Sequence, residues 1–482
     1  MSDARVAFLL TIAAFLTRYT LYLGTTIFGT DSAQFLLMAQ WMGEARFHDA
    51  LAITYHPLYP FLAAVLNVFV GDLERSGFWV SMVLGSAATA PLFLLVRSIF
   101  GRPAAVVTAL FYAVQPHTVE VHADVMTEGT FAFFFFSSMW LCWQSIEEPS
   151  LERSIVAGLA ACAAYLTRAE GILAVALVTF WPAAVALGRR EGRFRRLAGV
   201  GVGVAAILIL AFPFLVWVRS QMGTWKLSAK VSVNEAGRSF ESAQPREEDI
   251  GAKQGKSVWS GRYMKFVQSM GRLTYFVTVP FLILGFWGLR GHGWRGTLFY
   301  FSFPLLYLGG LLWSLRGVPY MSYRYLVPSM NLLMVMAGLG VGVLLRRWRE
   351  PRRTRWALAA VGAAVFVMMV PSLRPHRQEE SGYREAGRWL AAHKAPGAPF
   401  YTTTDKFNFF GGGGLRGFPP GLDAFRKEVE KSPAAYYVIV EKDMKEVRPL
   451  VEWLRSSGKV GEPVTIAAGR PGVWSVTAYP AR

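Results

Sequence analysis

Long apolar runs separated by short charged loops constrain the fold of this 482-residue chain more than any other feature of its sequence. A run of roughly 20 mainly apolar residues is long enough to cross the hydrocarbon core of a membrane as a helix. By this measure, about eleven candidate spans lie before Pro371. They lie near residues 5–27, 76–96, 103–118, 125–143, 154–167, 169–187, 197–218, 272–289, 296–314, 324–345 and 355–371. The sequence therefore predicts a polytopic α-helical membrane protein.

The last part of the chain, residues 372–482, has the composition of a soluble domain. Two of its segments have the spacing of amphipathic helices, 383–394 and 444–457. Four others are short and mostly rich in β-branched and aromatic residues, as strands are: 399–404, 435–441, 462–468 and 473–479. We therefore predict a membrane domain over residues 1–371 and a small α/β domain over residues 372–482.

Lys and Arg in the short loops predict how the spans are oriented, because basic short loops favour the cytoplasm. The most basic of these loops are residues 189–196 (RREGRFRR) and 346–355 (RRWREPRRTR). Threading eleven spans puts both loops on one side with the N-terminus, and puts the C-terminal domain on the other side. Much of the formal net charge of +18 then follows from topology and from contacts with membrane lipids, so it requires no nucleic-acid partner.

The first long loop on the outer side of this threading covers residues 28–75. The spacing of its apolar residues predicts a helix over 32–44 that lies along the membrane interface. A second apolar but short segment, 56–70, is predicted to be another interfacial or a re-entrant helix.

The second long outer loop covers residues 219–271 and is basic, with Lys226 and Lys230 among its charged residues. One interpretation is a lid that closes over an anionic ligand and contacts its phosphate. The alternative is a solvated flexible loop without a binding role.

Ionisable residues beside the apolar runs predict where function lies, since charged groups next to hydrocarbon are costly and usually mark a site. Four stretches hold them: Gly29–Tyr59, Gln115–Glu128, Thr167–Gly171 and Arg316–Tyr325. The threading places all four on the outer side. We therefore expect a single active site at the extracytoplasmic face of the membrane.

Two residues of the first outer loop are candidates for proton transfer. Asp31, just after the first span, could act as a general base towards a hydroxyl group, and the alternative is an N-cap for the following helix. His56, flanked by Tyr55 and Tyr59, could bind a metal, donate to a phosphate or relay a proton. The alternative for His56 is a structural hydrogen bond.

An acidic cluster lies at the outer junction of the third and fourth spans and contains Glu120, His122, Asp124 and Glu128. Asp124 and Glu128 are four residues apart, which predicts that they share one face at the start of a helix. Two close carboxylates could share a proton, bind a divalent cation or position an acceptor. The alternative is simply favourable negative charge at the start of a helix.

Arginines in the other two stretches are candidates for binding phosphate, the anion that guanidinium groups suit best. Arg168 forms a tight turn with Glu170 between two spans, and Arg324 enters the tenth span next to Tyr325. The alternatives are a structural ion pair and a side chain that snorkels to the interface. Arg18, inside the first span, is expected to snorkel outward or to face the site.

These residue types together suit one chemistry, the transfer of a group from a lipid-linked phosphate. The lipid tails would lie in the bilayer and the headgroup at its outer surface, where arginines hold the phosphate and a carboxylate deprotonates an acceptor hydroxyl. The sequence contains no phosphate-binding P-loop and no dinucleotide-binding fingerprint. A soluble nucleotide donor is therefore not expected.

Over residues 1–371 the chain resembles the GT-C class of polytopic glycosyltransferases, and most closely the branch that holds protein O-mannosyltransferases and the aminoarabinose transferase of lipid A. The residues that carry the resemblance keep the same order and the same side of the membrane. They are Asp31 after the first span, His56–Tyr59 (HP-x-x-Y), Asp124 with Glu128, Thr167–Gly171 (TR-x-EG) and Arg324–Pro328 (RY-x-x-P).

The resemblance implies an inverting hexosyl- or pentosyltransferase that uses a polyprenyl-phosphate sugar donor, with Asp31 as the base. It makes Arg168 and Arg324 candidate contacts to the donor phosphate, and it implies a glycan, lipid or protein acceptor. It also implies a bacterial cytoplasmic membrane as the location. The chain departs from the family where Ser32 follows Asp31 and where His56 replaces a lysine. These departures leave open the sugar and a divalent metal, for which His56, Asp124 and Glu128 are the candidate ligands.

Three other functions are compatible with parts of the sequence. A transporter or flippase of lipid-linked sugars is the main alternative, although transporters tend to hold ionisable groups near the bilayer midplane. A glycan polymerase or ligase would share the lipid-phosphate chemistry. A membrane scaffold with a sensory outer domain would need no catalytic base.

Overall fold

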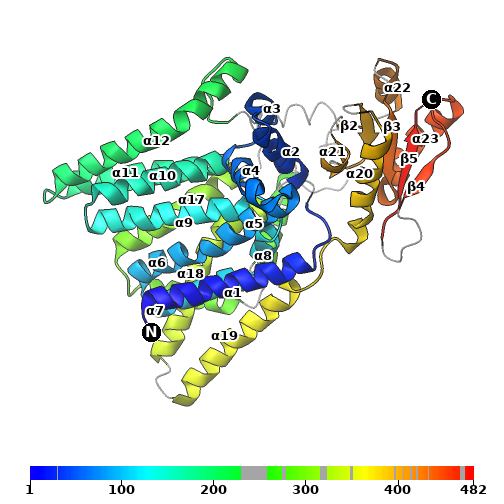
Figure 1. The fold of residues 1–482 in the computed structure, drawn as a ribbon. Coiled ribbons are helices and arrows are strands. Elements are labelled where there is room, and N and C mark those ends of the chain that lie inside the picture. Colours follow the sequence, from blue (N-terminus) through cyan, green and yellow to red (C-terminus); the bar gives the residue numbers. More distant parts are fainter. Residues whose placement is uncertain are drawn as a thin grey trace.

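A computed structural model provides the fold of the chain. It describes residues 1–482 apart from residue 30 and residues 229–257, 274–277, 315–322, 348–350, 396–397, 405, 413–414, 419–421, 432–433, 467–472 and 482. Figure 1 shows the long helices of the N-terminal part running in broadly similar directions, with the small sheet region at one end. The described residues of the polar stretches identified in the sequence lie at that same end.

In the described residues, every apolar run that the sequence analysis singled out coincides with a helix or a pair of helices. The helices are α1 (Asp3–Leu23), α5 (Leu73–Ala87), α6 (Thr89–Phe100), α7 (Arg102–Val114), α9 (Glu128–Glu147), α10 (Leu151–Thr167), α11 (Ile172–Gly188), α12 (Arg193–Met222), α16 (Val279–Leu289), α17 (Trp294–Ser314), α18 (Val327–Arg347) and α19 (Pro351–Ser372). In the described part of the chain, seven helical segments are long and apolar enough to cross a membrane. The chain is therefore a polytopic α-helical membrane protein, and the figure of about eleven crossings stays a prediction.

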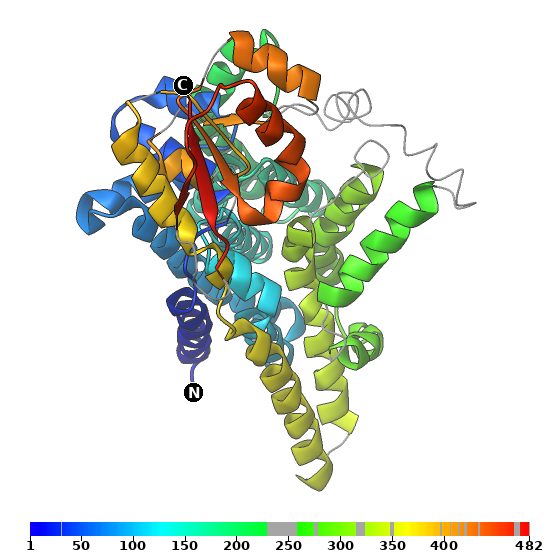
Figure 2. The same cartoon turned by 90° about the vertical axis from the view of Figure 1, so that its right-hand side faces the viewer.

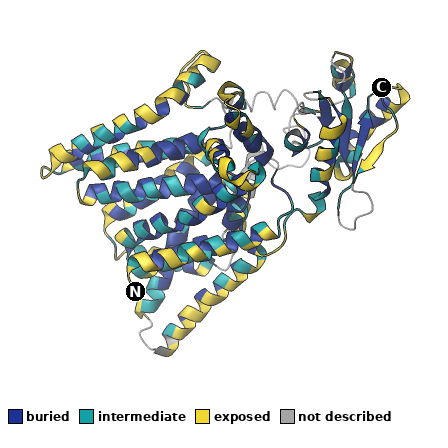
Figure 3. Ribbon diagram, in the orientation of Figure 1, coloured by how far each residue is buried: buried dark blue, intermediate teal, exposed yellow. Residues whose placement is uncertain are grey.

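Helix α18 is buried from Val327 to Val341, apart from half-buried Leu333, and its last residues are more exposed (Figure 3). Glycines allow it to lie against α16 with little separation, because a Cβ atom on Gly340 would fall 2.0 Å from the carbonyl oxygen of Phe281. Helix α12, by contrast, exposes large apolar side chains such as Ile209 and Phe212. An apolar outer surface of this kind is expected where helices face lipid.

Short helices cover the end of the bundle near the polar stretches: α2 (Ser32–Gly43), α3 (Phe47–Ala52), α4 (Leu58–Val70) and α8 (Pro116–His122). Helices α2 and α4 confirm the two helices predicted in the first outer loop, and their position at the interface stays a prediction. In the second outer loop, α15 (Val258–Leu273) is a helix that the sequence analysis did not predict.

The C-terminal region is a mixed α/β unit, as predicted. Its five strands are β1 (Phe400–Thr402), β2 (Leu415–Gly417), β3 (Tyr436–Val440), β4 (Val464–Ile466) and β5 (Val476–Pro480). They lie in the order β2-β1-β3-β5-β4, with β2, β1 and β3 parallel and β5 antiparallel to both β3 and β4. In Figure 2 the C-terminal unit faces the viewer. Helices α20 (Gly382–His393) and α23 (Met444–Ser456) match the predicted ones. Strand β2 and helices α21 (Lys406–Phe410) and α22 (Leu422–Lys431) were not predicted.

The C-terminal unit packs directly on the segment that follows α1. Phe28 stacks on Phe410 with ring centroids 5.2 Å apart, and both belong to a hydrophobic cluster that also includes Tyr383. The backbone N–H of Thr26 donates to the carbonyl oxygen of His376. This packing fixes the approach of the chain to Asp31, three residues after Phe28.

Candidate functional site at the end of the helical bundle

Two arginines and three carboxylates from distant parts of the chain form one continuous network. Nη1 of Arg324 lies 2.7 Å from Oδ2 of Asp31, and its Nε lies 3.3 Å from Oε1 of Glu128. The same Glu128 oxygen accepts a hydrogen bond of 2.8 Å from Nη1 of Arg168. Nη2 of Arg168 in turn lies 2.9 Å from Oε1 of Glu170. The structure thus brings together residues from all four predicted polar stretches.

The ends of helices hold these side chains in place. Asp31 directly precedes α2, and Glu128 is the first residue of α9. Arg168 follows α10 and precedes the short 3-10 helix η1 (Ala169–Gly171). Arg324 lies in the 3-10 helix η2 (Tyr323–Leu326), which leads into the buried α18. A change of chain direction at each helix end turns these polar groups towards one another.

Access to solvent differs across the network and decides which groups a ligand can reach. The Asp31 side chain is 43% exposed and that of Arg324 is 23% exposed, whereas that of Glu128 is 1% exposed. The Asp31 carboxylate makes no capping hydrogen bond to the described N–H groups of α2. The alternative of an N-cap is therefore not realised, and Asp31 presents its carboxylate to Arg324.

Arg168 is more deeply placed than Arg324. Besides its two glutamate partners, it donates to Oγ1 of Thr127 at 3.1 Å and lies over the ring of Tyr325, 5.9 Å from the centroid. Because two carboxylates already engage its guanidinium, Arg168 is held as the anchor of Glu128.

The prediction that Asp124 and Glu128 share one face of a helix is wrong. Helix α9 begins at Glu128, and Asp124 lies in the non-helical link after α8. There its Oδ1 accepts hydrogen bonds from the backbone N–H groups of Gly29 (3.0 Å) and Val125 (2.7 Å). The close approach requires glycine, because a Cβ atom on Gly29 would fall 2.7 Å from Oδ2 of Asp124.

Arg377 belongs to this neighbourhood, and the sequence analysis missed it. Its Nη2 lies 2.8 Å from Oδ2 of Asp124, and its Nη1 donates to the carbonyl oxygen of Ile27 at 3.2 Å. Burial alone would lower the pKa of Arg377, but the charge and hydrogen bond of Asp124 raise that pKa above its usual value. Arg377 therefore stays charged and ties the C-terminal segment to the link between α8 and α9.

Three predicted residues have mainly structural surroundings. The His56 ring is buried between Tyr165 and Phe214, with centroids 5.4 and 5.2 Å away. The Tyr59 hydroxyl donates to the carbonyl oxygen of Gly77, and the Tyr55 ring packs edge-on against Phe35.

The described residues contain no group of three or more His, Cys, Asp or Glu side chains placed to share a metal ion. His56, Asp124 and Glu128, the candidate ligands of a divalent cation, are therefore not gathered into one site. His56 packs against aromatic rings. Asp124 contacts backbone N–H groups and Arg377, and Glu128 contacts Arg168 and Arg324.

The prediction that Arg18 snorkels out of the bundle is wrong. Its side chain is fully buried, donates to the carbonyl oxygens of Ala14 and Ala113 at 2.8 and 3.2 Å, and lies 3.2 Å from Nδ1 of His122. His122 thus faces Arg18 and not the carboxylates of its own stretch. Backbone carbonyl groups and one ring nitrogen solvate this buried cation.

Glu120 and the second outer loop complete the predicted set. Glu120 accepts a hydrogen bond of 3.1 Å from the Tyr323 hydroxyl, next to Arg324, and its Oε2 lies 3.6 Å from Nδ1 of His117. Lys226 is exposed, and its neighbour Leu227 accepts a hydrogen bond from the Tyr165 hydroxyl. Lys230 and most of the predicted lid, residues 229–257, lie outside the described residues.

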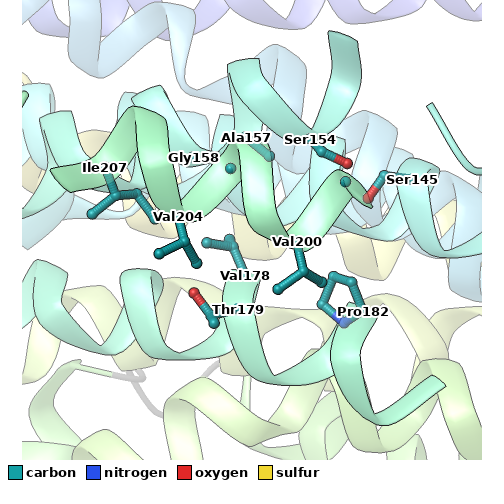
Figure 4. A pocket seen from close by; sticks show the side chains of 12 residues that line it. Ser145, Ser154, Ala157, Gly158, Val178, Thr179, Pro182, Val200, Val204 and Ile207 are labelled. Carbon is teal, nitrogen blue, oxygen red and sulfur yellow. The ribbon is translucent and has the colours of Figure 1, made fainter. Parts of the chain in front are cut away.

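A small cavity among α9, α10, α11 and α12 is unrelated to this network (Figure 4). Its polar side chains are the hydroxyl groups of Ser145, Ser154 and Thr179, and its lining holds no ionisable residue. It forms where Gly158 approaches Gly203 too closely for a Cβ atom, so it reflects helix packing.

Residues 55–217 match the sequence profile of the family described as dolichyl-phosphate-mannose-protein mannosyltransferase. No curated protein shows significant sequence similarity to the chain.

Several solved structures share the fold. ArnT from Cupriavidus metallidurans in the apo state superposes with a TM-score of 0.65 at 14% identity, over 99% of this chain and 98% of that chain. The same protein bound to undecaprenyl phosphate gives a TM-score of 0.66 at 14% identity, with the same coverage. The oligosaccharyltransferase from Archaeoglobus fulgidus gives 0.57 at 12% identity, over 95% of this chain and 71% of that chain.

At these identities the likeness is one of fold, and it extends over nearly the whole chain. The family profile adds a sequence match over α4 to α12, which contains Glu128 and Arg168. The resemblance of this chain to the GT-C class of membrane glycosyltransferases is therefore confirmed, in fold over nearly the whole chain and in sequence to the protein mannosyltransferase family over residues 55–217.

Proposed function

We propose that this protein is an inverting glycosyltransferase that moves a sugar from a polyprenyl phosphate to an acceptor hydroxyl at the extracytoplasmic face of the membrane. The single observation that carries the proposal is the contact between Asp31 and Arg324. It places a carboxylate, which can accept a proton, next to a guanidinium, which can hold a phosphate, where both are accessible.

The two residues would work by exchanging partners. When the donor phosphate enters, it competes with Asp31 for the guanidinium of Arg324, because phosphate accepts hydrogen bonds from arginine as well as a carboxylate does. Glu128 behind them keeps Arg324 in place through its Nε. The Asp31 carboxylate is then free to accept the hydrogen bond of the acceptor hydroxyl.

The transfer is a single displacement. The acceptor oxygen attacks the anomeric carbon, the bond from that carbon to the phosphate oxygen breaks, and the hydroxyl proton passes to Asp31. The leaving polyprenyl phosphate carries the released charge, which Arg324 stabilises. Attack opposite the leaving phosphate inverts the anomeric centre.

The other predicted residues receive different parts. Arg168, first considered as a phosphate contact, serves in this proposal to anchor Glu128, since its Nη1 and Nη2 are engaged by Glu128 and Glu170. Asp124, with Arg377, holds the segment around Gly29 from which Asp31 projects. Lys226 is a further candidate for the donor phosphate, because its loop docks on Tyr165 near the end of α10.

Support for a lipid-linked donor comes from the relatives. The matched family is described as using dolichyl-phosphate mannose, and one neighbour of the same fold was solved with undecaprenyl phosphate bound. By the distribution of basic loops, we place the N-terminus in the cytoplasm and the C-terminal unit outside. The family resemblance implies that the membrane is a bacterial cytoplasmic membrane. Neither the fold nor the family match supports a transporter.

The test uses the full-length protein reconstituted in lipid vesicles. It is incubated with a panel of polyprenyl-phosphate sugars and a membrane lipid and glycan extract as the acceptor source. We expect release of polyprenyl phosphate from one donor, with the sugar in the product inverted at its anomeric carbon by NMR. A folded protein that neither binds nor cleaves any donor in the panel would contradict the proposal.

A further inference from the structure

A second, larger cavity lies apart from the Asp31 network, between the C-terminal unit and the ends of two candidate spans. It has a volume of about 320 Å³ and is lined by the last turn of α1 (Tyr22 and Leu23), the first turns of α5 and one face of α20. A volume of this size equals about ten water molecules in the liquid. It can therefore hold a phosphate group together with the small alcohol or amine attached to it.

The charges that line the cavity have a net positive sign. Arg75, Arg384 and Arg388 line it together with Asp72 and Glu74. Arg384 pairs with Glu74 at 2.6 Å, and Arg75 lies 3.4 Å from Asp72. Arg388 follows Arg384 by one helical turn, so the two guanidinium groups lie on one face of α20.

Arg388 is the cation in excess. In the described part of the chain, no carboxylate lies within ion-pair distance of its exposed guanidinium, although it contributes to the electrostatic environment of Glu74. The neighbouring acids are already engaged by Arg384 and Arg75. Arg388 can therefore bind an anion in the cavity without first breaking an ion pair with a carboxylate.

An aromatic wall continues from the cavity along the two spans. Tyr22 packs on Phe78 with centroids 5.0 Å apart, and Tyr19 lies 6.1 Å from Trp79. One turn further along α1, Phe15 stacks on Tyr19 at 5.7 Å. Tyr19, Trp79 and Phe15 are half-buried, so part of each residue stays accessible. Aromatic side chains in this position are typical of the boundary between hydrocarbon and headgroups.

We propose that this cavity binds the phosphate headgroup of a membrane phospholipid, with the phosphate on Arg384 and Arg388 and the acyl chains along Tyr19 and Trp79. The combination of a cationic recess at the ends of two spans and an aromatic strip below it matches a molecule with a phosphate at one end and hydrocarbon at the other. A bound headgroup would bridge α20 to α1 and α5. The lipid is neither the sugar donor nor the acceptor, since no lining residue belongs to the Asp31 network.

The test measures lipid binding to the delipidated full-length protein by native mass spectrometry. Three probes separate the sources of the phosphate: a short-chain phosphatidylglycerol, the diacylglycerol with the same tails, and glycerol phosphate without tails. Arg388→Gln removes the cation in excess at an exposed position. Arg448→Gln removes the charge of another exposed arginine of the C-terminal unit, on α23, and serves as the matched control.

We expect phosphatidylglycerol to bind the unsubstituted protein, Arg388→Gln to weaken that binding about tenfold, and Arg448→Gln to leave it unchanged. The diacylglycerol and glycerol phosphate should each bind much more weakly than the intact phospholipid. Equal phospholipid binding by Arg388→Gln and Arg448→Gln, or none by the unsubstituted protein, would overturn the proposal. Glycerol phosphate binding as tightly as the phospholipid would also overturn it, because the ligand would then be a free phosphate.

Discussion

Oδ2 of Asp31 lies 2.7 Å from Nη1 of Arg324, although 293 positions separate the two residues in the chain. Asp31 comes from the segment after the first span and Arg324 from the start of α18. Their contact therefore forms only when α18 is in place. Buried Glu128, shared by Arg324 and Arg168, holds the pair from the inner side.

Replacing Arg324 should impair donor binding more than it impairs folding. In Arg324→Lys, the compact ammonium group cannot contact Glu128 and a phosphate at once, as the forked guanidinium can. We expect the donor KM to rise about tenfold and kcat to fall, measured as release of polyprenyl phosphate. The exposed Arg374 provides the control, because Arg374→Lys should leave both constants unchanged. An unaltered donor KM in Arg324→Lys would exclude Arg324 as the phosphate contact.

Replacing Glu128 should destabilise the fold. Glu128→Gln leaves the guanidinium groups of Arg168 and Arg324 without their shared carboxylate in a buried place, which costs about 3 kcal/mol. Thermal unfolding in detergent should show a clearly lower Tm. The exposed Glu147, at the other end of α9, is the control, and Glu147→Gln should unfold at the same Tm as the unsubstituted protein. Matching Tm values for the two variants would argue against a structural role for the network.

Asp124 and Arg377 should act as one unit in stability. Asp124→Asn and Arg377→Gln each leave one charge unpaired beside Gly29, so the second substitution should cost little once the first is present. We expect a coupling energy of about 1–3 kcal/mol from a double-mutant cycle of unfolding free energies. Strict additivity of the two single effects would show that the ion pair does not stabilise the protein.

Acid should weaken the contacts around Glu120. Burial alone would raise the pKa of Glu120, but the nearby imidazole of His117, the charge of His376 and the hydrogen bond from Tyr323 hold that pKa below the usual 4.5. A carboxyl group with a lowered folded pKa contributes stability above its unfolded pKa and loses that contribution as the pH falls through the folded value.

The Tm difference between the unsubstituted protein and Glu120→Gln should therefore be largest near about pH 6 and shrink below about pH 4.5. The exposed Glu462 is a suitable control, since Glu462→Gln should change the Tm little at either pH. A Tm difference for Glu120→Gln that stays constant down to about pH 3 would contradict the assignment.

Much of the helical architecture could be predicted because the length and apolarity of a single sequence segment are enough to indicate a membrane-spanning helix. The small C-terminal elements were harder. Strand β2 has three residues next to a run of glycines, so it carries almost no pattern of its own. Helix α22 does carry a signal, with Leu422, Phe425 and Val429 at helical spacing, that the sequence analysis overlooked.

The network of Asp31, Glu128, Arg168 and Arg324 could be anticipated because each residue stands out as an ionisable group beside an apolar run. Arg377 could not, since it lies in a segment where charged residues are common. Only its contact with Asp124, 253 positions away, distinguishes it. For the same reason the inward turn of Arg18 towards His122 was not foreseen, because it depends on packing between α1 and α8.

The central claim is that Asp31 is the base, and the most direct test is the rate of polyprenyl phosphate release at saturating donor and acceptor. We predict that Asp31→Asn lowers this rate by at least about 100-fold without loss of donor binding, because an amide cannot take the proton of the acceptor hydroxyl. Asp49→Asn, which alters an exposed carboxylate on the same outer loop, should leave the rate unchanged. An Asp31→Asn protein that releases polyprenyl phosphate as fast as Asp49→Asn would contradict the account.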